Sequence, residues 1–465
     1  MSMLLGILLA SMLHSAYAGA ATPKTDQAWV FSGEGFLRAE GNRIVDEKGS
    51  IILLRGANFF GYEYGLWSMH TELDYRTMAS WGFNIVRLPI AWNFIEPQPG
   101  RYDDSYFTNY VDRDIAWAKK YGLRIILDMH QYSWSPYFTY FDSWHTAGVP
   151  SWAVSSYPNT AEGESRAVAD FWSGLGPNGT SPSATNLPMK ARFIDMWKHV
   201  AGRYVGEMIV AGYDLFNEPS VFSSDGSYVY DVNQFCKETE AQFLETVIDG
   251  IRTVDANHMS FWEPCVIHFT STTLSRHVDR INVAFSPHYP GIEILSPNGY
   301  DGDSAKLQAY FEATVLGYAK AWNQPVFVGE WGILVNAPNA AQFIRDFSAL
   351  LDRNLVGGTW WSYGSARFGS VLFDENGRER KDLTANLVRP YVAASSAPLS
   401  TSNWDPNKRI LRIDLAYPST VKAHFPSSYG RFKVTADGVS LSWRLVRQIL
   451  TASASGACQL VIAAK

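Results

Sequence analysis

The chain has 465 residues, of which 46% are hydrophobic and 18% are charged, and its formal net charge is −6 at pH 7. This length allows one large domain with a smaller one beside it, and the hydrophobic content is sufficient for a full core. The mild negative charge excludes an electrostatic basis for binding nucleic acid or an anionic membrane. Aromatic residues make up 14% of the chain. Because aromatic rings stack on the apolar faces of sugars, this excess favours a carbohydrate site.

The first 21 residues predict a secretory signal peptide. An apolar run at 3–13 is followed by Ala16-Tyr17-Ala18, the pattern of small residues that precedes a cleavage site. The run is too short to cross a bilayer, which takes about 20 apolar residues. We therefore expect a secreted or lumenal protein that is not stably inserted in a membrane.

From 30 to 395 the sequence alternates short apolar runs with helical patterns of apolar residues. This alternation predicts an α/β protein, a (β/α)8 TIM barrel that forms the catalytic domain. The expected helices lie at 73–81, 106–121, 189–204, 235–251, 306–322 and 341–351. The expected barrel strands lie at 51–54, 83–89, 123–128, 208–216, 258–262, 281–285, 325–330 and 357–363.

Three further segments fall outside this alternation. A hairpin at 36–46 is expected to close the bottom of the barrel. Residues 398–465 contain short alternating runs, which predict a small C-terminal all-β sandwich domain. The insert at 132–187 is long and expected to be irregular, so it is a candidate functional loop. Its aromatic residues either form a wall for substrate or pack the loop against itself, and the candidates are Trp134, Tyr137, Phe138, Trp144 and Trp152.

Cysteines are few, which excludes a framework of several disulfides. The chain has Cys236, Cys265 and Cys458. One bridge between Cys236 and Cys265 and three free thiols are both compatible with the sequence. The sequence has no glycine-rich nucleotide loop and no metal-ligand spacing of Cys and His, so we expect no cofactor and no metal.

Two glutamates stand at the ends of apolar strands. The run at 208–216 leads into Asn217-Glu218-Pro219, and the run at 325–328 leads into Gly329-Glu330. The carboxyl ends of barrel strands share one face, so the two carboxylates are expected to meet there. Each glutamate alone is compatible with a helix cap or an ion pair. Together they predict glycoside hydrolysis, which needs one carboxyl to protonate the leaving oxygen and another to attack the sugar or activate water.

From about 53 to 363 the chain resembles glycoside hydrolase family five. The residues that carry the resemblance are Asn217-Glu218-Pro219, Gly329-Glu330, Arg87 in Val86-Arg87-Leu88-Pro89, His130 in Asp128-Met129-His130, and Trp361-Ser362-Tyr363.

The resemblance implies a retaining mechanism with Glu218 as general acid/base and Glu330 as nucleophile. Asn217 would bind the sugar 2-hydroxyl, and Arg87 would keep Glu330 ionised. For the remaining site residues, the resemblance implies that His130 and His288 line the subsite of the cleaved sugar, that Trp361 stacks beneath it, and that Tyr289 is a partner of Glu330.

The segments 372–377 and 387–391 and the β-rich tail resemble the endoglycoceramidase subgroup, which releases glycan from the ceramide of glycosphingolipids. The chain departs from that subgroup at Tyr132, where an aspartate is usual after Met-His-Gln. We therefore expect a monomeric enzyme whose partner is a glycolipid or carbohydrate substrate. An endo-β-1,4-glucanase is the alternative, and a non-catalytic glycan-binding barrel is the third.

Overall fold

The computed structural model describes residues 30–59, 61–140, 146–221, 234–265, 276–289, 298–365 and 369–465. Within these residues a parallel eight-stranded sheet has the order β10-β11-β4-β5-β6-β7-β8-β9. A parallel bridge between Phe285 and Val326 joins its two edges, so the sheet closes and the predicted (β/α)8 barrel is confirmed. The strands are β4 (Arg55–Phe59), β5 (Ile85–Ile90), β6 (Arg124–Met129), β7 (Val210–Asp214), β8 (Met259–Trp262), β9 (Val283–Phe285), β10 (Phe327–Trp331) and β11 (Gly357–Tyr363).

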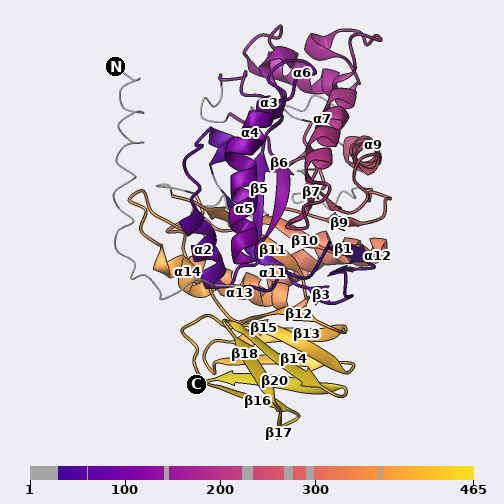
Figure 1. Cartoon of the computed structure of the whole chain (residues 1–465). Helices are drawn as coiled ribbons and strands as arrows, with labels where there is room; N and C mark the ends of the chain where they lie inside the picture. The colour runs from indigo at the N-terminus through magenta and orange to yellow at the C-terminus, as the bar shows by residue number, and fades with distance from the viewer. Residues whose placement is uncertain are drawn as a thin grey trace.

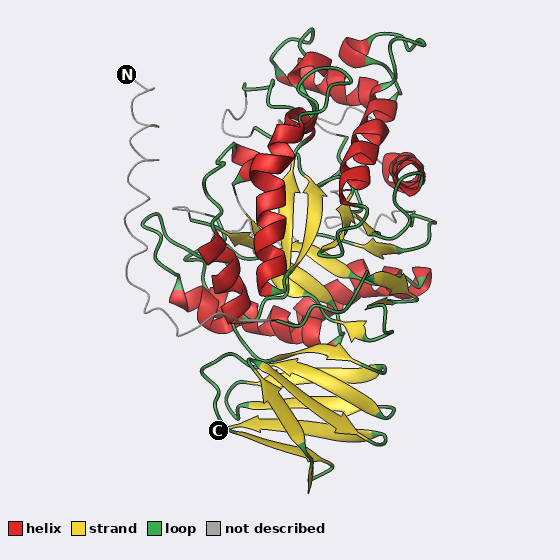
Figure 2. Cartoon of the chain, viewed as in Figure 1, coloured by secondary structure: helices red, strands yellow, loops and turns green. Residues whose placement is uncertain are grey.

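Helices cover the outside of the barrel (Figures 1 and 2). Each places one apolar face on the strands: in α7, Phe193, Trp197 and Val200 are all buried. Gly122 ends α5 with a positive φ of 82°, a conformation that glycine adopts without strain. The larger helices are α2 (Glu72–Trp81), α5 (Asp112–Tyr121), α6 (Ala161–Trp172), α7 (Met189–Tyr204), α9 (Glu240–Arg252), α11 (Ser304–Phe311), α12 (Gly317–Trp322), α13 (Ala340–Arg353) and α14 (Lys381–Leu387).

Two predictions about the barrel are wrong. The first barrel strand is β4, whereas the more apolar segment at 51–54 contributes β3 (Ile51–Ile52) to another sheet. A Cβ at Gly56 of β4 would lie 1.8 Å from the carbonyl oxygen of Ile85, so close strand packing selects glycine there over a larger apolar residue. The insert at 132–187 is also more regular than expected, since it contains α6. Its Trp134 and Phe138 are buried, whereas Trp144 lies outside the described residues.

The C-terminal segment forms two antiparallel sheets with a core of their own. The seven-stranded sheet also takes in the N-terminal hairpin and β12, in the order β1-β2-β3-β12-β15-β19-β18. This sheet therefore crosses the boundary expected between 395 and 398, and the hairpin belongs to the sandwich. The strands are β1 (Arg38–Glu40), β2 (Arg43–Val45), β12 (Tyr391–Ser395), β13 (Leu399–Asp405), β14 (Ile410–Leu415), β15 (Ser419–His424), β16 (Phe432–Ala436), β17 (Val439–Ser440), β18 (Trp443–Val446), β19 (Ile449–Ala454) and β20 (Cys458–Ala464).

The sandwich packs beneath the barrel, against the amino ends of its strands (Figure 1). The Tyr391 hydroxyl donates to the carbonyl of Gly82 at 2.6 Å, and the N–H of Leu53 donates to the carbonyl of Ala393 at 3.0 Å. The sandwich does not cover the opposite face of the barrel, at the carboxyl ends of the strands, where the candidate site lies (Figure 1).

Candidate active site

Glu218 and Glu330 meet at the carboxyl ends of the barrel strands. Glu218 follows β7 and Glu330 lies in β10. One carboxylate oxygen of each, together with a ring nitrogen of His288, lie within 4.8 Å of one another. Their side chains are 31% and 15% exposed, respectively. The structure thus places two partly exposed carboxyls at the close separation that retaining glycosidases use, about 5 Å.

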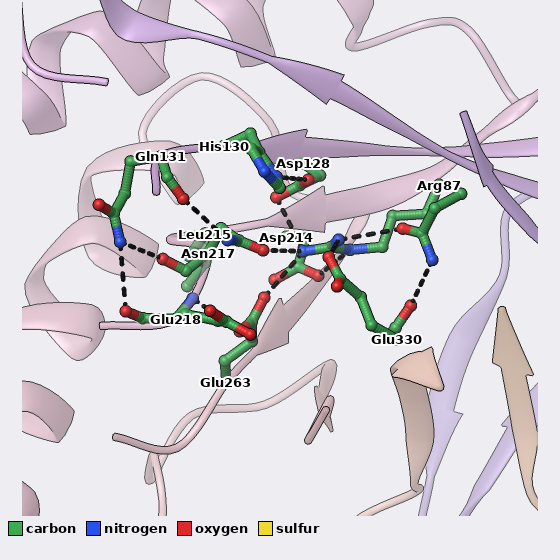
Figure 3. A network of polar contacts seen from close by, with 12 residues as sticks. Arg87, Asp128, His130, Gln131, Asp214, Leu215, Asn217, Glu218, Glu263 and Glu330 are labelled. Carbon is green, nitrogen blue, oxygen red and sulfur yellow. Dashed lines mark hydrogen bonds and ion pairs between the residues drawn. The ribbon is translucent and has the colours of Figure 1, made fainter. Parts of the chain in front are cut away.

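Arg87 in β5 is the centre of this face, and Figure 3 shows its guanidinium surrounded by acidic side chains. Arg87 is fully buried. Its Nη1 donates to Glu330 at 2.7 Å, its Nη2 donates to Asn217 at 3.0 Å, and it pairs with three further carboxylates. Those three are Asp214 at 2.8 Å from Nε, and Asp128 at 2.9 Å and Glu263 at 2.8 Å from Nη2.

The two predicted histidines contact different carboxylates of this centre. His130 Nδ1 lies 2.8 Å from Oδ2 of Asp128, and its ring is parallel to that of Trp361, with 5.6 Å between the ring centroids. His288 Nδ1 lies 3.0 Å from Oε1 of Glu218. The other nitrogen of His288, Nε2, lies 3.1 Å from Oε1 of Glu263.

The backbone beside Glu218 is fixed by neighbouring side chains. Gln131 Nε2 donates to the carbonyls of Asn217 at 2.8 Å and of Glu218 at 3.2 Å. Asn217 donates back to the Gln131 carbonyl at 2.9 Å. Glu218 has a φ of +44°, in the left-handed region that is costly for a residue with a Cβ. The network around it therefore determines where its carboxyl points.

Tyr289 is placed differently from the other predicted site residues. Its ring is buried and packs on Phe347 with 4.7 Å between the ring centroids. Its backbone N–H donates to the carbonyl of Glu330 at 2.7 Å. The main chain of Tyr289 thus supports Glu330, and a contact of its side chain with sugar stays a prediction.

Gly329 and Asn58 allow Glu330 of β10 to lie close to Arg87 and His288. A Cβ at Gly329 would lie 3.1 Å from ring atoms of His288. Asn58 in β4 donates to the Gly329 carbonyl at 2.9 Å and accepts from Arg87 Nη1 at 3.0 Å. These contacts fix Glu330 against Arg87.

The two glutamates have different acidities. Burial raises the pKa of Glu330 to about 7, and the charge of Glu218 adds to the rise, although His288 and Arg87 act against it. Burial also acts to raise the pKa of Glu218, but the hydrogen bond and charge of His288, together with the charges of His130 and Arg87, hold that pKa below the usual range. Between the two pKa values the pair therefore holds one proton.

The family resemblance implied that Arg87 would keep Glu330 ionised. Arg87 does act to lower the pKa of Glu330, but burial outweighs it. Burial, with Glu263 and Asp128, raises the pKa of Asp214 well above its usual range in spite of Arg87. Although burial disfavours the charged ring, Asp128 raises the pKa of His130 to about 9.

Several residues of the site were not predicted from the sequence. Asp214 ends β7, and Asp128 and Asn58 are the last residues but one of β6 and β4. Glu263 follows β8 in the segment Trp262-Glu263-Pro264, the same Glu-Pro ending that marked Glu218. That repeat was the signal in the sequence that could have found it.

A closed barrel with two carboxyls about 5 Å apart on the face where its strands end defines a glycoside hydrolase, an enzyme that hydrolyses O-glycosyl bonds. The chain belongs to the cellulase family, glycosyl hydrolase family 5, whose model matches residues 45–367. This confirms the family expected from the sequence motifs.

The relatives include both endoglycoceramidases and endoglucanases. The chain is 23% identical to endoglycoceramidase I of Rhodococcus hoagii, over 90% of this chain and 86% of that one. It is 24% identical to an endoglucanase of Paenibacillus polymyxa, over 78% of this chain and 90% of that one. The solved structure of endo-glycoceramidase II from Rhodococcus sp. with a cellobiose-like isofagomine has a TM-score of 0.74 and 23% identity, covering 92% of this chain and 99% of that chain. At this identity the structural likeness shows the fold, including the C-terminal sheets.

Proposed function

We propose that this protein is a retaining endoglycoceramidase-like hydrolase, which cleaves the β-glycosidic bond between a glycan and the lipid of a glycosphingolipid. The close approach of Glu218 and Glu330, within 4.8 Å, is the observation that carries the retaining reaction. The likeness to endoglycoceramidase I, which spans barrel and sandwich over 90% of the chain, supports the substrate class.

The reaction follows from the geometry of the pair. Glu330 attacks the anomeric carbon while Glu218 gives its proton to the leaving oxygen, so the glycosidic bond breaks and a glycosyl ester forms on Glu330. Glu218 then takes a proton from water, and the resulting hydroxide displaces Glu330 from the sugar. Two inversions at one carbon return the β-anomer. The reactive form is the one in which the shared proton lies on Glu218.

The surrounding side chains are proposed to hold the sugar. Asn217 lies beside Glu218 and is oriented by Arg87 and Gln131, so its amide is suited to bind the 2-hydroxyl. His130 has a pKa of about 9 and therefore stays charged at neutral pH, where it can donate to a hydroxyl. The indole of Trp361, parallel to the His130 ring, is suited to stack beneath the sugar.

An endo-β-1,4-glucanase is the second candidate, because one group of relatives is named as endoglucanases. Tyr132 favours this reading, since it is 55% exposed at the position where the endoglycoceramidase pattern has an aspartate. An exposed aromatic ring there is suited to stack on a glucose ring of a longer chain.

Incubation with a ganglioside and with carboxymethyl cellulose, side by side, separates the two functions. Release of intact oligosaccharide and ceramide from the ganglioside, with no new reducing ends from the cellulose, is the expected result. The reverse pattern assigns the glucanase function. A control endoglycoceramidase must cut the ganglioside, and a control cellulase must cut the cellulose. If the wild-type protein then cuts neither substrate, the proposal is overturned.

Secretion is part of the same proposal. Residues 1–29 lie outside the described residues, so the predicted signal rests on its sequence pattern. A disulfide joins Cys236 to Cys265 with 5.5 Å between their Cα atoms, and disulfides are typical of oxidising compartments. No helix of the described part is long and apolar enough to cross a membrane. Mass measurement of the exported protein tests cleavage after about residue 21, and light scattering tests the proposed monomer.

A further inference from the structure

We infer that Glu263 is a positioning residue, which sets the direction of the Glu218 carboxyl and holds the proton on His288. This inference rests on the proposed function, because it assigns to Glu263 the support of the general acid/base. Glu263 is buried, with 2% of its surface exposed, and it follows β8, the strand next to β7 in the barrel. Figure 3 shows its side chain between Glu218 and the guanidinium of Arg87.

The two oxygens of Glu263 act on different partners. Oε2 accepts a hydrogen bond from the backbone N–H of Glu218 at 2.8 Å. Oε1 accepts from Arg87 Nη2 at 2.8 Å and lies 3.1 Å from Nε2 of His288. One carboxylate thus contacts the main chain of the acid/base and both cations beside it.

The contact with the main chain constrains Glu218. A φ of +44° at a residue with a Cβ is unfavourable, so the surroundings must hold it. Glu263 accepts the N–H of Glu218 on one side of this residue, and Gln131 donates to the Glu218 carbonyl on the other at 3.2 Å. Without Glu263 this N–H loses its partner, and the backbone can relax toward an unstrained conformation that turns the carboxyl away.

The contact with His288 controls charge. His288 is 2% exposed, and the charged groups that act on it include Glu263, Glu330, Glu218 and Asp128. Glu263 is the one anion that contacts its Nε2 in the described part of the structure, while Nδ1 points to Glu218 at 3.0 Å. A negative charge at Nε2 keeps the ring protonated, so that Nδ1 donates to Glu218.

The test uses Glu263→Gln and Glu263→Ala in the full-length protein. Glu263→Ala is expected to lower kcat on an aryl β-glycoside about 100-fold with little change in KM, since a misdirected catalytic group costs about this much. Glu263→Gln keeps an oxygen that can accept the Glu218 N–H, so its loss of kcat is expected to be smaller than that of Glu263→Ala. It also removes the negative charge, so the His288 ring, followed by NMR in the free protein, is expected to lose its proton at a lower pH than in wild type.

Asp255→Asn is the matched control. Asp255 precedes β8 at its other end, is buried, and contacts Nδ1 of His258 at 2.5 Å, so its loss costs stability without touching the site. Unchanged titration of His288 and unchanged kcat in both Glu263 variants, with only the thermal stability lowered as in the control, would overturn the inference. If Glu263→Ala does not fold, Glu263→Gln carries the test. The NMR titration needs no turnover, so it stays decisive even if wild type hydrolyses no glycoside.

Discussion

The guanidinium of Arg87 is shared by four carboxylates, those of Asp128, Asp214, Glu263 and Glu330. At the scale of single residues, an arginine 2.7 Å from Glu330 acts to lower the pKa of that carboxyl but does not make it a strong acid. Burial dominates instead and raises the pKa of Glu330 to about 7. The pKa of Glu218 is lowered in spite of burial, because His288 forms a hydrogen bond with it and the charges of His288, His130 and Arg87 favour its anion.

The pH dependence of hydrolysis follows from this pair. Below about pH 7 the pair keeps one proton, which the general acid requires, and above it both groups ionise. We expect kcat/KM for an aryl β-glycoside to fall as pH rises through about 7, tenfold per pH unit. A profile that stays flat from pH 6 to pH 9 would show that the last proton is not held by these carboxyls.

Replacing Glu330 by Gln is expected to stabilise the fold while abolishing turnover. The folded-state pKa of Glu330, about 7, lies above that of an unfolded glutamate, so ionisation costs stability increasingly from about pH 4.5 to pH 7, and fully above pH 7. The amide escapes this cost, which amounts to about 3 kcal/mol at most. Thermal unfolding at pH 8 should show a higher Tm for Glu330→Gln, and at pH 4 the two proteins should unfold alike. A lower Tm at pH 8 would contradict this account.

At the scale of elements, the acidic groups of the site stand at or near the carboxyl ends of barrel strands, and Arg87 reaches them from within β5. This is why Glu218 and Glu330 could be predicted from sequence: each ends an apolar run. Arg87, His130, Asn217, His288 and Trp361 were named through family resemblance, and their mutual contacts were not readable from spacing. The first strand was misplaced because the segment at 51–54 is more apolar than β4. In β4, Gly56 is required by its close approach to Ile85, and Asn58 accepts a hydrogen bond from Arg87. Both contacts are made with β5, so the sequence of β4 alone does not reveal them.

The disulfide between Cys236 and Cys265 tethers the segment that follows β8, two residues after Glu263. It closes a loop with a sequence separation of 29, for which chain entropy gives about 3–4 kcal/mol of stabilisation. The double variant Cys236→Ser with Cys265→Ser should lose about that much stability in urea unfolding. Cys458→Ser, at the free thiol, is the control and should unfold like wild type. Equal midpoints for all three proteins would mean that the bridge contributes nothing.

At the scale of the whole molecule, the sandwich and the barrel form a buried interface. His424 at the end of β15 is fully buried there, and a Cβ at Gly82, which ends α2, would lie 1.8 Å from its ring. Its Nε2 lies 2.7 Å from Oε1 of Gln448. Burial lowers the pKa of His424 to about 4, so the ring is neutral in the folded protein.

Lowering the pH should therefore reduce the stability of the folded protein through His424. An unfolded histidine has a pKa of about 6.5, so the unfolded state gains a proton first, and stability falls as pH drops from about 6.5 to 4. The loss attributable to His424 is about 3 kcal/mol at pH 4. Thermal unfolding between pH 7 and pH 4 should show a shallower decline for His424→Gln than for wild type. Parallel declines would assign the acid sensitivity to other groups.

In the proposed reaction Glu330 forms a covalent bond with the sugar while Glu218 supplies the proton. The most direct test is mass spectrometry of peptides from the protein treated with a 2-deoxy-2-fluoro glycoside that has a good leaving group, which slows breakdown of the glycosyl–enzyme. The account predicts one added fluorosugar per chain, on the peptide that contains Glu330, and no label in Glu330→Gln. A label on another residue, or turnover with no covalent adduct and an inverted first product, would contradict it.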